Sequence, residues 1–322
     1  MITLLEAKVG MADKVDQMVI DEFRRGSFLL DALIFDNAVS PGTGGSTLVY
    51  GYIKLLTPSS AGFRALNTEY TNNEAKRIKA TAELKIFGGN FKIDRVIINT
   101  SGVVDELNFQ LTQKIKASIN LFHYSTINGD SALNEDEFDG LDVILSGSST
   151  EYNTGSNIDL STSASIDTNY NEFLDMMNTF LSKLSARPDM LLMNSDMKVK
   201  MSSVARRAKY LTQSEDAFGR PVECYNGIPM VDLEYYYDGN KTVPCVPIDP
   251  VDGTTSIFAV KIALDGFHGV SPLGGKVINT TLPNLKEAGV MKEGDVEMVA
   301  AVVLKDSRKA GVFRNIKIAP VV

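Results

Sequence analysis

The stretch that decides the fold is Ser101–Leu141, SGVVDELNFQLTQKIKASINLFHYSTINGDSALNEDEFDGL. Its apolar residues recur every three or four positions, which places them on one face of an α-helix. We predict that this helix runs from Val103 to Tyr124, roughly 33 Å at the 1.5 Å rise of each residue, with Ser101 as its N-cap. A helix of this length with one apolar stripe needs a surface to lie on, so we expect the rest of the chain to build layers against it. The stripe consists of Val104, Leu107, Leu111, Ile115, Ile119 and Phe122.

The composition is that of a folded globular protein. The chain has 322 residues, of which 44% are hydrophobic and 22% charged, and this length allows two compact domains or one large domain with extensions. The 32 basic and 40 acidic residues give a net charge of −8. Because an acidic surface repels phosphate, we do not expect the whole chain to bind nucleic acid tightly.

Cysteine usage and hydropathy indicate where the protein is made. Cys224 and Cys245 are too few for a disulfide framework and fit a reducing compartment. Met1–Asp21 carries charges throughout and lacks the unbroken apolar run of a signal peptide. No apolar run approaches the ~18 residues that a membrane span requires. We therefore expect a soluble protein, synthesised in the cytoplasm, with no membrane partner.

Upstream of the long helix, the sequence predicts a long β-hairpin with a wide tip. Thr47–Leu56 is the expected first strand, and Ile78–Ile86 alternates apolar and polar residues as a strand with one apolar face does. An isolated hairpin is marginally stable in water, and no third strand is evident between these two. Its support is either the long helix of the same chain or another copy of the protein. Phe63 and Arg64 at the tip favour in part the second, because they are costly to expose without use.

The sequence gives weaker predictions for the segments before and after this hairpin. We predict that Met1–Asp36 is an amphipathic arm, with much of its apolar surface in Phe28-Leu29-Leu30 and Leu33-Ile34-Phe35. Two interpretations of the arm stay open, packing in the core of its own subunit or packing on a neighbouring subunit. After the hairpin, Gly88-Gly89 predicts a β-bulge, and Phe91–Ile98 predicts a strand that leads into the long helix.

Beyond Leu141 the sequence predicts a mixed α/β region. Residues 146–165 are rich in Ser, Thr, Asn and Gly, which indicates an exposed loop or a domain boundary. Asn169 and Glu172 resemble a capping box that opens the next helix. Its predicted apolar stripe is Phe173, Met177, Phe180 and Leu184. The remaining predicted elements are a buried strand at Met190–Met193, a helix capped by Ser195 or Asp196, a hairpin turn at Asn226-Gly227, and strands at Ile257–Ala263, Val296–Leu304 and Val312–Ile318.

The sequence shows no catalytic or metal-binding pattern. His123 and His268 have no metal-ligand spacing, and HExxH, CxxC and GxSxG motifs are absent. We interpret His123, near the end of the long helix, as a surface residue or as a residue that interacts with the helix dipole. Residues 269–276 do not form a phosphate-binding loop, because Gly275 occupies the lysine position and no Ser or Thr follows Lys276. Ala132 occupies a ligand position of a calcium loop, so residues 130–137 are interpreted as a solvated acidic loop. We expect no enzyme activity, no cofactor and no metal site.

In this order and spacing, the parts resemble the Hong Kong 97-type major capsid protein of tailed phages over most of the chain. The most specific match is Ile127-Asn128-Gly129-Asp130 with Glu137-Phe138-Asp139-Gly140-Leu141, which resembles the segment after the spine helix of that family. Gly62–Thr71 is similar to the tip of the family's extended loop, and Leu84–Gly89 to the strand that returns from it. Further similar stretches are the arm at 4–31, axial-domain segments at 189–194 and 227–231, and a late strand and loop at 259–270.

The resemblance implies an α+β protein with the Hong Kong 97-like capsid fold in five parts. It also implies that the subunits form hexamers and pentamers, which close into an icosahedral shell around double-stranded phage DNA. We expect contacts between subunits at Phe28, Leu29, Phe63, Arg64, Asn67 and Glu69. The five parts are an N-terminal arm at 1–40, an extended β-hairpin loop at 41–89, a peripheral β-sheet domain with the spine helix at 90–145, a mixed α/β axial domain at 146–270, and C-terminal strands at 271–322 that return to the peripheral and axial domains.

The same resemblance implies partners and a location. The partners are other copies of the chain, portal and scaffolding proteins, and packaged DNA that is held only weakly and non-specifically. The location is the virion capsid, after synthesis in the host cytoplasm. Three alternatives stay open. An encapsulin-like nanocompartment shell would have a pocket for cargo peptides on its inner wall, a hydrolase with an unrecognised site would lose activity on replacement of one Asp or Ser, and a monomeric binding module would remain a 35.1 kDa species at every concentration.

Overall fold

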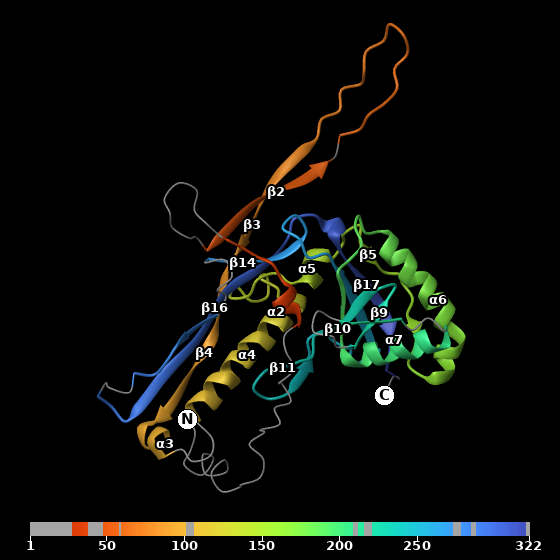
Figure 1. The fold of residues 1–322 in the computed structure, drawn as a ribbon. Helices are drawn as coiled ribbons and strands as arrows, with labels where there is room; N and C mark the ends of the chain where they lie inside the picture. The colour runs from red at the N-terminus through yellow and green to blue at the C-terminus, as the bar shows by residue number, and fades with distance from the viewer. Residues whose placement is uncertain are drawn as a thin grey trace.

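The structure is a computed structural model with two large sheets, a long helix that lies along one of them, and a hairpin that projects from the body (Figure 1). The arm up to residue 27 and the predicted cap Ser101 lie outside the described residues, as does the side chain of Phe28. The described residues are 28–37, 48–57, 59–100, 106–208, 212–215, 221–272, 278–284 and 288–319.

The first sheet has five strands and is built around β16 (Met291–Leu304). This strand pairs antiparallel with β4 (Lys85–Asp94), β14 (Phe267–Ser271) and β15 (Ile278–Thr281). A short strand, β1 (Phe35–Asn37), extends the sheet by parallel pairing with β14. The predicted strand at Val296–Leu304 is thus confirmed, and it begins earlier, at Met291.

The prediction of a bulge at Gly88-Gly89 is wrong. The pairing of β4 with β16 runs without a register shift through both glycines. A Cβ at Gly88 would lie 2.0 Å from the carbonyl oxygen of Val296, at a φ of +151°. The residue is therefore required for a close backbone approach, which only glycine allows.

The predicted strand at Phe91–Ile98 is correct only as far as Asp94. There the side chain of Asp94 accepts a hydrogen bond from the backbone N–H of Val96 at 2.7 Å. This contact opens a short helix, α3 (Arg95–Thr100). Asp is a favoured residue at helix starts because its carboxylate satisfies an N–H that has no partner within the helix.

The predicted long helix is α4 (Glu106–Asn128), which lies along β4 and β16 (Figure 1). It continues four residues beyond the predicted end at Tyr124. Phe122 is fully buried, and its ring stacks on Phe87 with centroids 6.0 Å apart. Leu107, Leu111 and Phe122 of the predicted stripe therefore pack as expected. Ile115 and Ile119 are only partly buried, and Val104 lies outside the described residues. Nearer its N-terminus, the packed residues are Leu107 and Leu111 of α4 with Phe91, Ile93, Ile97 and Ile98.

The segment that follows α4 closes on itself through two glycines. The N–H of Gly140 donates to the carbonyl of Gly129 at 2.8 Å. A Cβ at Gly129 would lie 2.2 Å from the oxygen of Phe138, and a Cβ at Gly140 would lie 2.6 Å from the oxygen of Ile127. These contacts explain why the sequence pattern is so specific here. The short helix α5 (Leu141–Leu145) starts directly after this closure.

The second sheet has eight strands, and both faces of its central strand β7 (Met190–Met193) are covered. Leu191 and Met193 face the core formed with helices α6 (Ser163–Ser182) and α7 (Ser195–Arg207). Met190 and Leu192 face the core that contains Phe122. The other strands are β5 (Glu151–Tyr152), β6 (Ile158–Asp159), β8 (Thr212–Glu215), β9 (Pro221–Tyr225), β10 (Ile228–Asp232), β13 (Thr254–Val260) and β17 (Ala310–Lys317).

Three of the four predicted core residues of α6 are confirmed, but Leu184 follows the end of the helix at Ser182, and the predicted helix starts are wrong. Phe173, Met177 and Phe180 are fully buried, whereas the helix begins after Thr162, whose hydroxyl accepts from the N–H of Ser165 at 3.1 Å. The predicted cap at Asn169 therefore lies inside the helix. For α7 the cap is Asn194, which accepts from the N–H of Met197 at 2.8 Å, in place of the predicted Ser195 or Asp196.

The predicted turn at Asn226-Gly227 is confirmed, and smaller elements complete the fold. Asn226 and Gly227 have φ values of 50° and 72° between β9 and β10, as a tight hairpin turn requires. Tyr236 stacks on Tyr124 of α4 at 5.0 Å and so attaches a two-stranded sheet to the long helix. The smaller elements are α2 (Phe28–Ala32), β11 (Tyr235–Tyr237), β12 (Thr242–Pro244) and the 3-10 helix Ser307–Lys309.

Candidate assembly surface

The predicted hairpin is confirmed and projects away from both sheets (Figure 1). Its strands are β2 (Val49–Thr57) and β3 (Lys76–Glu83), which pair antiparallel. In the described part of the chain no third strand joins them. The hairpin therefore contributes two faces, and the subunit covers only part of one.

The covered part is the base, where Tyr50 of β2 contacts the five-stranded sheet. The Tyr50 hydroxyl donates to Asp36 Oδ2 at 2.6 Å. Lys305 Nζ lies 5.2 Å from the centroid of the same ring and 3.8 Å from Asp36 Oδ2, while the His268 ring meets it edge-on at 6.0 Å. Sequence reasoning missed this anchor because its residues come from separate strands.

The pKa values of Tyr50 and Asp36 are shifted in the directions that favour their hydrogen bond. Burial, followed by the hydrogen bond to Asp36, raises the pKa of Tyr50, and the hydrogen bond from Tyr50 lowers the pKa of Asp36. At neutral pH the phenol is therefore protonated and the carboxylate ionised, which is the stronger, charge-assisted form of the bond. This hydrogen bond therefore holds the base of the hairpin against the five-stranded sheet over a wide pH range around neutrality.

The strand predicted at Ile78–Ile86 is divided at Leu84, because β3 ends at Glu83 and β4 begins at Lys85. Its predicted apolar face is partly uncovered in the subunit. Leu84 is buried, and its N–H donates to the carbonyl of Leu48 at 2.7 Å. Ile78 and Ile86, by contrast, are 48% and 58% exposed. Lys85 fastens the end of the hairpin to the acidic loop, because its Nζ donates to Glu83 at 3.0 Å and to the carbonyl of Glu135 at 2.7 Å.

The tip of the hairpin holds most of the predicted contact residues, and every residue from 59 to 75 is exposed. Phe63 is fully exposed. Arg64 donates to the carbonyl of Thr68 at 3.1 Å, and its guanidinium lies 5.3 Å from the centroid of the Tyr70 ring. These contacts order the tip locally without covering it. Asn67, with a φ of 64°, lies in the exposed turn that the hydrogen bond from the Thr68 N–H to the Ala65 carbonyl closes, and the exposed Glu69 follows it.

Phe28 and Leu29, the two predicted contact residues before the hairpin, differ from the residues of the tip. Leu29 is fully buried and packs in the core that contains Phe122. For this residue the structure favours the first of the two interpretations of the arm, packing within its own subunit. The Phe28 side chain lies outside the described residues.

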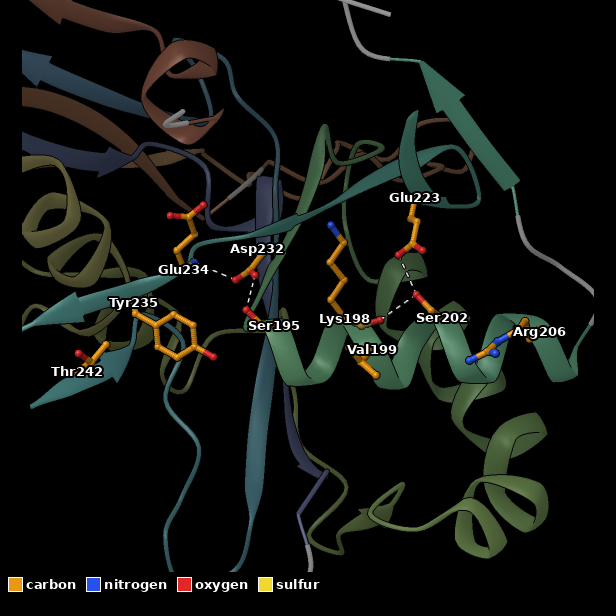
Figure 2. Close-up of a pocket in the computed structure, with 10 residues that line it drawn as sticks. All are labelled: Ser195, Lys198, Val199, Ser202, Arg206, Glu223, Asp232, Glu234, Tyr235 and Thr242. Atoms are coloured by element: carbon orange, nitrogen blue, oxygen red, sulfur yellow. Dashed lines mark hydrogen bonds between the residues drawn. The ribbon is translucent and has the colours of Figure 1, made fainter. Parts of the chain in front are cut away.

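A polar groove of about 640 Å³ runs along α7 in the eight-stranded part of the molecule (Figure 2). The Ser202 hydroxyl donates to Glu223 at 2.7 Å, and the Ser195 hydroxyl donates to Asp232. Both hydroxyls are thus engaged by carboxylates. The described lining residues include no histidine or cysteine, so this groove lacks the imidazole or thiol of the usual nucleophile pairs.

The interpretation of His123 as a surface residue is wrong. His123 is buried in α4, and burial lowers its pKa to about 4. His268 is also buried, with a lowered pKa. In the described part of the chain, no three His, Cys, Asp or Glu side chains are placed to hold a metal ion. None of the described helices is both long and apolar enough to span a membrane.

Comparison with known proteins gives matches in structure but not in sequence. No protein family model and no curated protein matches the chain. The holo-SrpI encapsulin complex from Synechococcus elongatus PCC 7942 is similar with a TM-score of 0.63 and 14% identity, over 100% of this chain and 98% of that chain. A structure from Mycobacterium phage Bobi gives 0.60 and 13%, over 97% and 98%. The capsid of Myoviridae phage XM1 gives 0.54 and 12%, over 93% and 95%.

These likenesses extend over nearly the whole length of each chain, and at these identities they bear on the fold. They agree with the arrangement described above, in which a long helix lies along one sheet, a second sheet carries two helices, and a hairpin projects from the body. The chain has the Hong Kong 97-like capsid fold that the resemblance of its motifs implies.

Proposed function

We propose that the protein is a shell subunit, the major capsid protein of a tailed phage, which assembles with copies of itself. The observation that carries this proposal is the projecting hairpin, whose exposed tip and partly uncovered apolar face have no partner surface among the described residues of the subunit. Large contiguous apolar patches on the surface of a soluble protein mark interaction sites. A surface that recurs on every copy is suited to closed, symmetric assembly.

In this proposal the subunits form hexamers and pentamers, which close into an icosahedral shell around double-stranded DNA. The contact residues are Phe63, Arg64, Asn67 and Glu69 of the tip. The net charge of −8 suits an inner wall that holds packaged DNA only weakly and non-specifically. Portal and scaffolding proteins are the further partners, the virion capsid is the location, and the host cytoplasm is the place of synthesis. The five-part division from the arm at 1–40 to the C-terminal strands at 271–322 belongs to this proposal.

Electron microscopy of the expressed protein, alone and with its scaffold, is the test. We expect rings or closed particles made of many copies. Only monomers or dimers under every condition, scaffold included, would contradict the proposal. The same outcome would favour a monomeric binding module.

An encapsulin-like nanocompartment shell is the second candidate, and the full-length likeness to an encapsulin favours it. The two candidates differ in what the shell encloses. Particles that recruit a cargo protein through a short peptide, and that show no dependence on a portal or a DNA-packaging motor, would favour the nanocompartment. Particles from infected cells that contain nuclease-protected double-stranded DNA would favour the phage capsid.

A further inference from the structure

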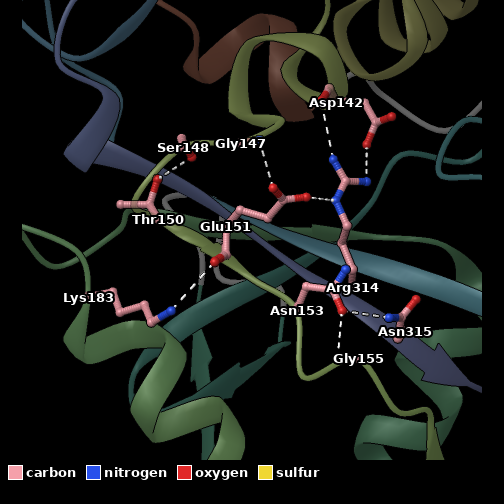
Figure 3. Close-up of polar contacts among 10 residues, drawn as sticks. All are labelled: Asp142, Gly147, Ser148, Thr150, Glu151, Asn153, Gly155, Lys183, Arg314 and Asn315. Atoms are coloured by element: carbon pink, nitrogen blue, oxygen red, sulfur yellow. Dashed lines mark hydrogen bonds and ion pairs between the residues drawn. The ribbon is translucent and has the colours of Figure 1, made fainter.

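One polar network joins the long-helix side of the molecule to the eight-stranded sheet (Figure 3). After α4 and its closing loop, the chain reaches that sheet through residues 141–153, which comprise α5, a turn and β5. The last strand, β17, runs beside this connecting segment and pairs in parallel with β5. The side chains of β17 are therefore placed to hold the connection between the two parts.

Arg314 of β17 holds both ends of the connecting segment with one guanidinium. Its Nη1 donates to Asp142 Oδ1 at 2.5 Å, and its Nη2 donates to the carbonyl of Asp142 at 3.2 Å. Its Nε donates to Glu151 Oε1. The second oxygen of Glu151 accepts from the N–H of Gly147 at 2.7 Å, so the turn between the two acids is fixed as well.

Further contacts of β17 and the residues before it keep the segment in register. The Thr150 hydroxyl donates to the carbonyl of Ser307 at 3.1 Å. A Cβ at Gly311 would lie 2.9 Å from the oxygen of Thr150, so the two backbones approach closely. Asn315, with a φ of 63°, donates to Asn153 Oδ1 at 2.7 Å. Among these polar contacts, those of Arg314 reach α5, whereas the others end at Thr150, directly before β5, and at Asn153, directly after it.

An apolar core also joins α4 to the eight-stranded sheet, but it defines the angle between them less well than the directional contacts of Arg314 do. Phe122, Leu141 and Leu145 share one core with Leu192 and Val312 of the eight-stranded sheet. Apolar contacts are non-directional, whereas a guanidinium is a planar, rigid fork that binds carboxylates in fixed directions. Arg314 is 20% exposed, so the fork is partly shielded from competing water.

We propose that Arg314 is a positioning residue that fixes the angle between α4 and the eight-stranded sheet, and thereby the curvature of the assembled shell. This inference rests on the proposed function. In a closed particle of identical subunits, the shape of each subunit sets the angle to its neighbours. A small change of that angle is repeated at every contact and alters the diameter at which the shell closes.

The test compares Arg314→Met with the matched control Arg207→Met. Arg207 pairs with Asp167 and donates to the Ser163 hydroxyl at 2.7 Å, so the control removes a similar ion pair that lies wholly between α6 and α7. Particle diameters are measured by electron microscopy. We expect Arg314→Met to give shells of more than one diameter, or a shifted single diameter, and Arg207→Met to keep the wild-type diameter.

A purely structural role of Arg314 would lower thermal stability and leave the diameter unchanged, and that result would overturn the inference. If Arg314→Met does not fold, Arg314→Lys and Asp142→Asn are judged by the same criterion, because each keeps part of the network. A wild-type protein that forms no shells would contradict the proposed function itself. Small-angle scattering of the unassembled subunit then still tests the angle, and a profile unchanged by Asp142→Asn would overturn it.

Discussion

Phe63 lies at the tip of the hairpin with its whole ring in solvent, so it contributes no burial to the folding of the subunit. We predict that Phe63→Ser leaves the melting temperature of the unassembled subunit unchanged. Burial of a phenyl ring at a contact would be lost, which reduces the association constant on the order of ten- to a hundredfold. Particle yield against protein concentration, measured by light scattering, checks this.

Leu133 provides the matched control, because it is 87% exposed but lies on the acidic loop after α4. Leu133→Ser removes a similar apolar area at a different place. We expect its assembly to follow the wild-type curve more closely than that of Phe63→Ser. Equal assembly of Phe63→Ser and the wild type would remove the tip from the contact.

His123 makes the stability of the unassembled subunit depend on pH. Burial lowers its pKa from 6.5 to about 4, so between these values the unfolded chain binds a proton that the folded chain does not. The free energy of unfolding therefore falls as pH decreases from 6.5 to about 4, by at most about 3 kcal/mol from this residue. We predict that His123→Gln flattens this part of the profile in urea unfolding. The carboxylates titrate in both proteins, so the same slope in both would contradict the prediction.

The burial of His123 could have been predicted from the sequence. It lies four residues after Ile119 and directly beside Phe122, so helical periodicity places it at the edge of the apolar stripe. The wrong interpretation came from the side chain's polarity and from a predicted helix end at Tyr124, whereas α4 continues to Asn128. Asn128 supports this longer helix by donating to the carbonyl of Cys245 at 2.7 Å, a contact with a distant residue that local sequence does not reveal.

At the scale of elements, signals carried by neighbouring residues predicted structure well. The Asn226-Gly227 turn, the period-two strand that includes Ile78 and the four buried residues of β7 are of this kind. Helix boundaries were predicted wrongly where the same residue types favour both helix caps and loops. Thr162 caps α6 from a segment whose Ser, Thr and Asn content also indicates a loop, since the same side chains favour both caps and turns.

Pattern also failed where tertiary contacts override local preference. Arg95–Thr100 contains the β-branched residues Val96, Ile97 and Ile98, which favour a strand, yet it forms α3 because Asp94 caps it and Ile97 is buried against Phe91 and Ile93. The exposed hairpin is the reverse case. Its two strands were predicted, although the second was extended to Ile86 whereas β3 ends at Glu83. The unusual exposure of its tip was the feature that indicated assembly.

The hairpin tip is also the element whose removal separates folding from assembly. We predict that deletion of Ser59–Asn67 leaves a folded subunit with an unchanged circular dichroism spectrum, because this segment is exposed and the hydrogen bonds of Ser60 and Arg64 stay within the tip. Particles should no longer form, as seen by electron microscopy. Particles of normal size from the deletion variant would show that the tip has no role in assembly.

At the scale of the whole molecule, the sequence left the spatial order of the strands undetermined. β16 lies between β4 and β14 although it is the second-last strand in the chain. Arg314 meets Asp142 across 172 positions of sequence. No periodicity links residues so far apart, so contacts of this kind became visible only in the folded chain. The candidate surface was predicted at the tip, but its anchor at Tyr50 and Asp36 was not.

Because only the base of the hairpin is covered in the free subunit, its amide hydrogen exchange should differ between free and assembled subunits. In the free subunit β2 and β3 form a two-stranded ladder, and such ladders are marginally stable in water. We predict that their amides exchange quickly with deuterium in the free subunit and slowly in the shell, where a neighbouring copy covers them. Amides of β7 and β13, in the middle of the eight-stranded sheet, serve as the internal control and should be protected in both states. Equal protection of the hairpin in both states would show that its stability comes from its own subunit, and the argument for assembly from its exposed face would fail.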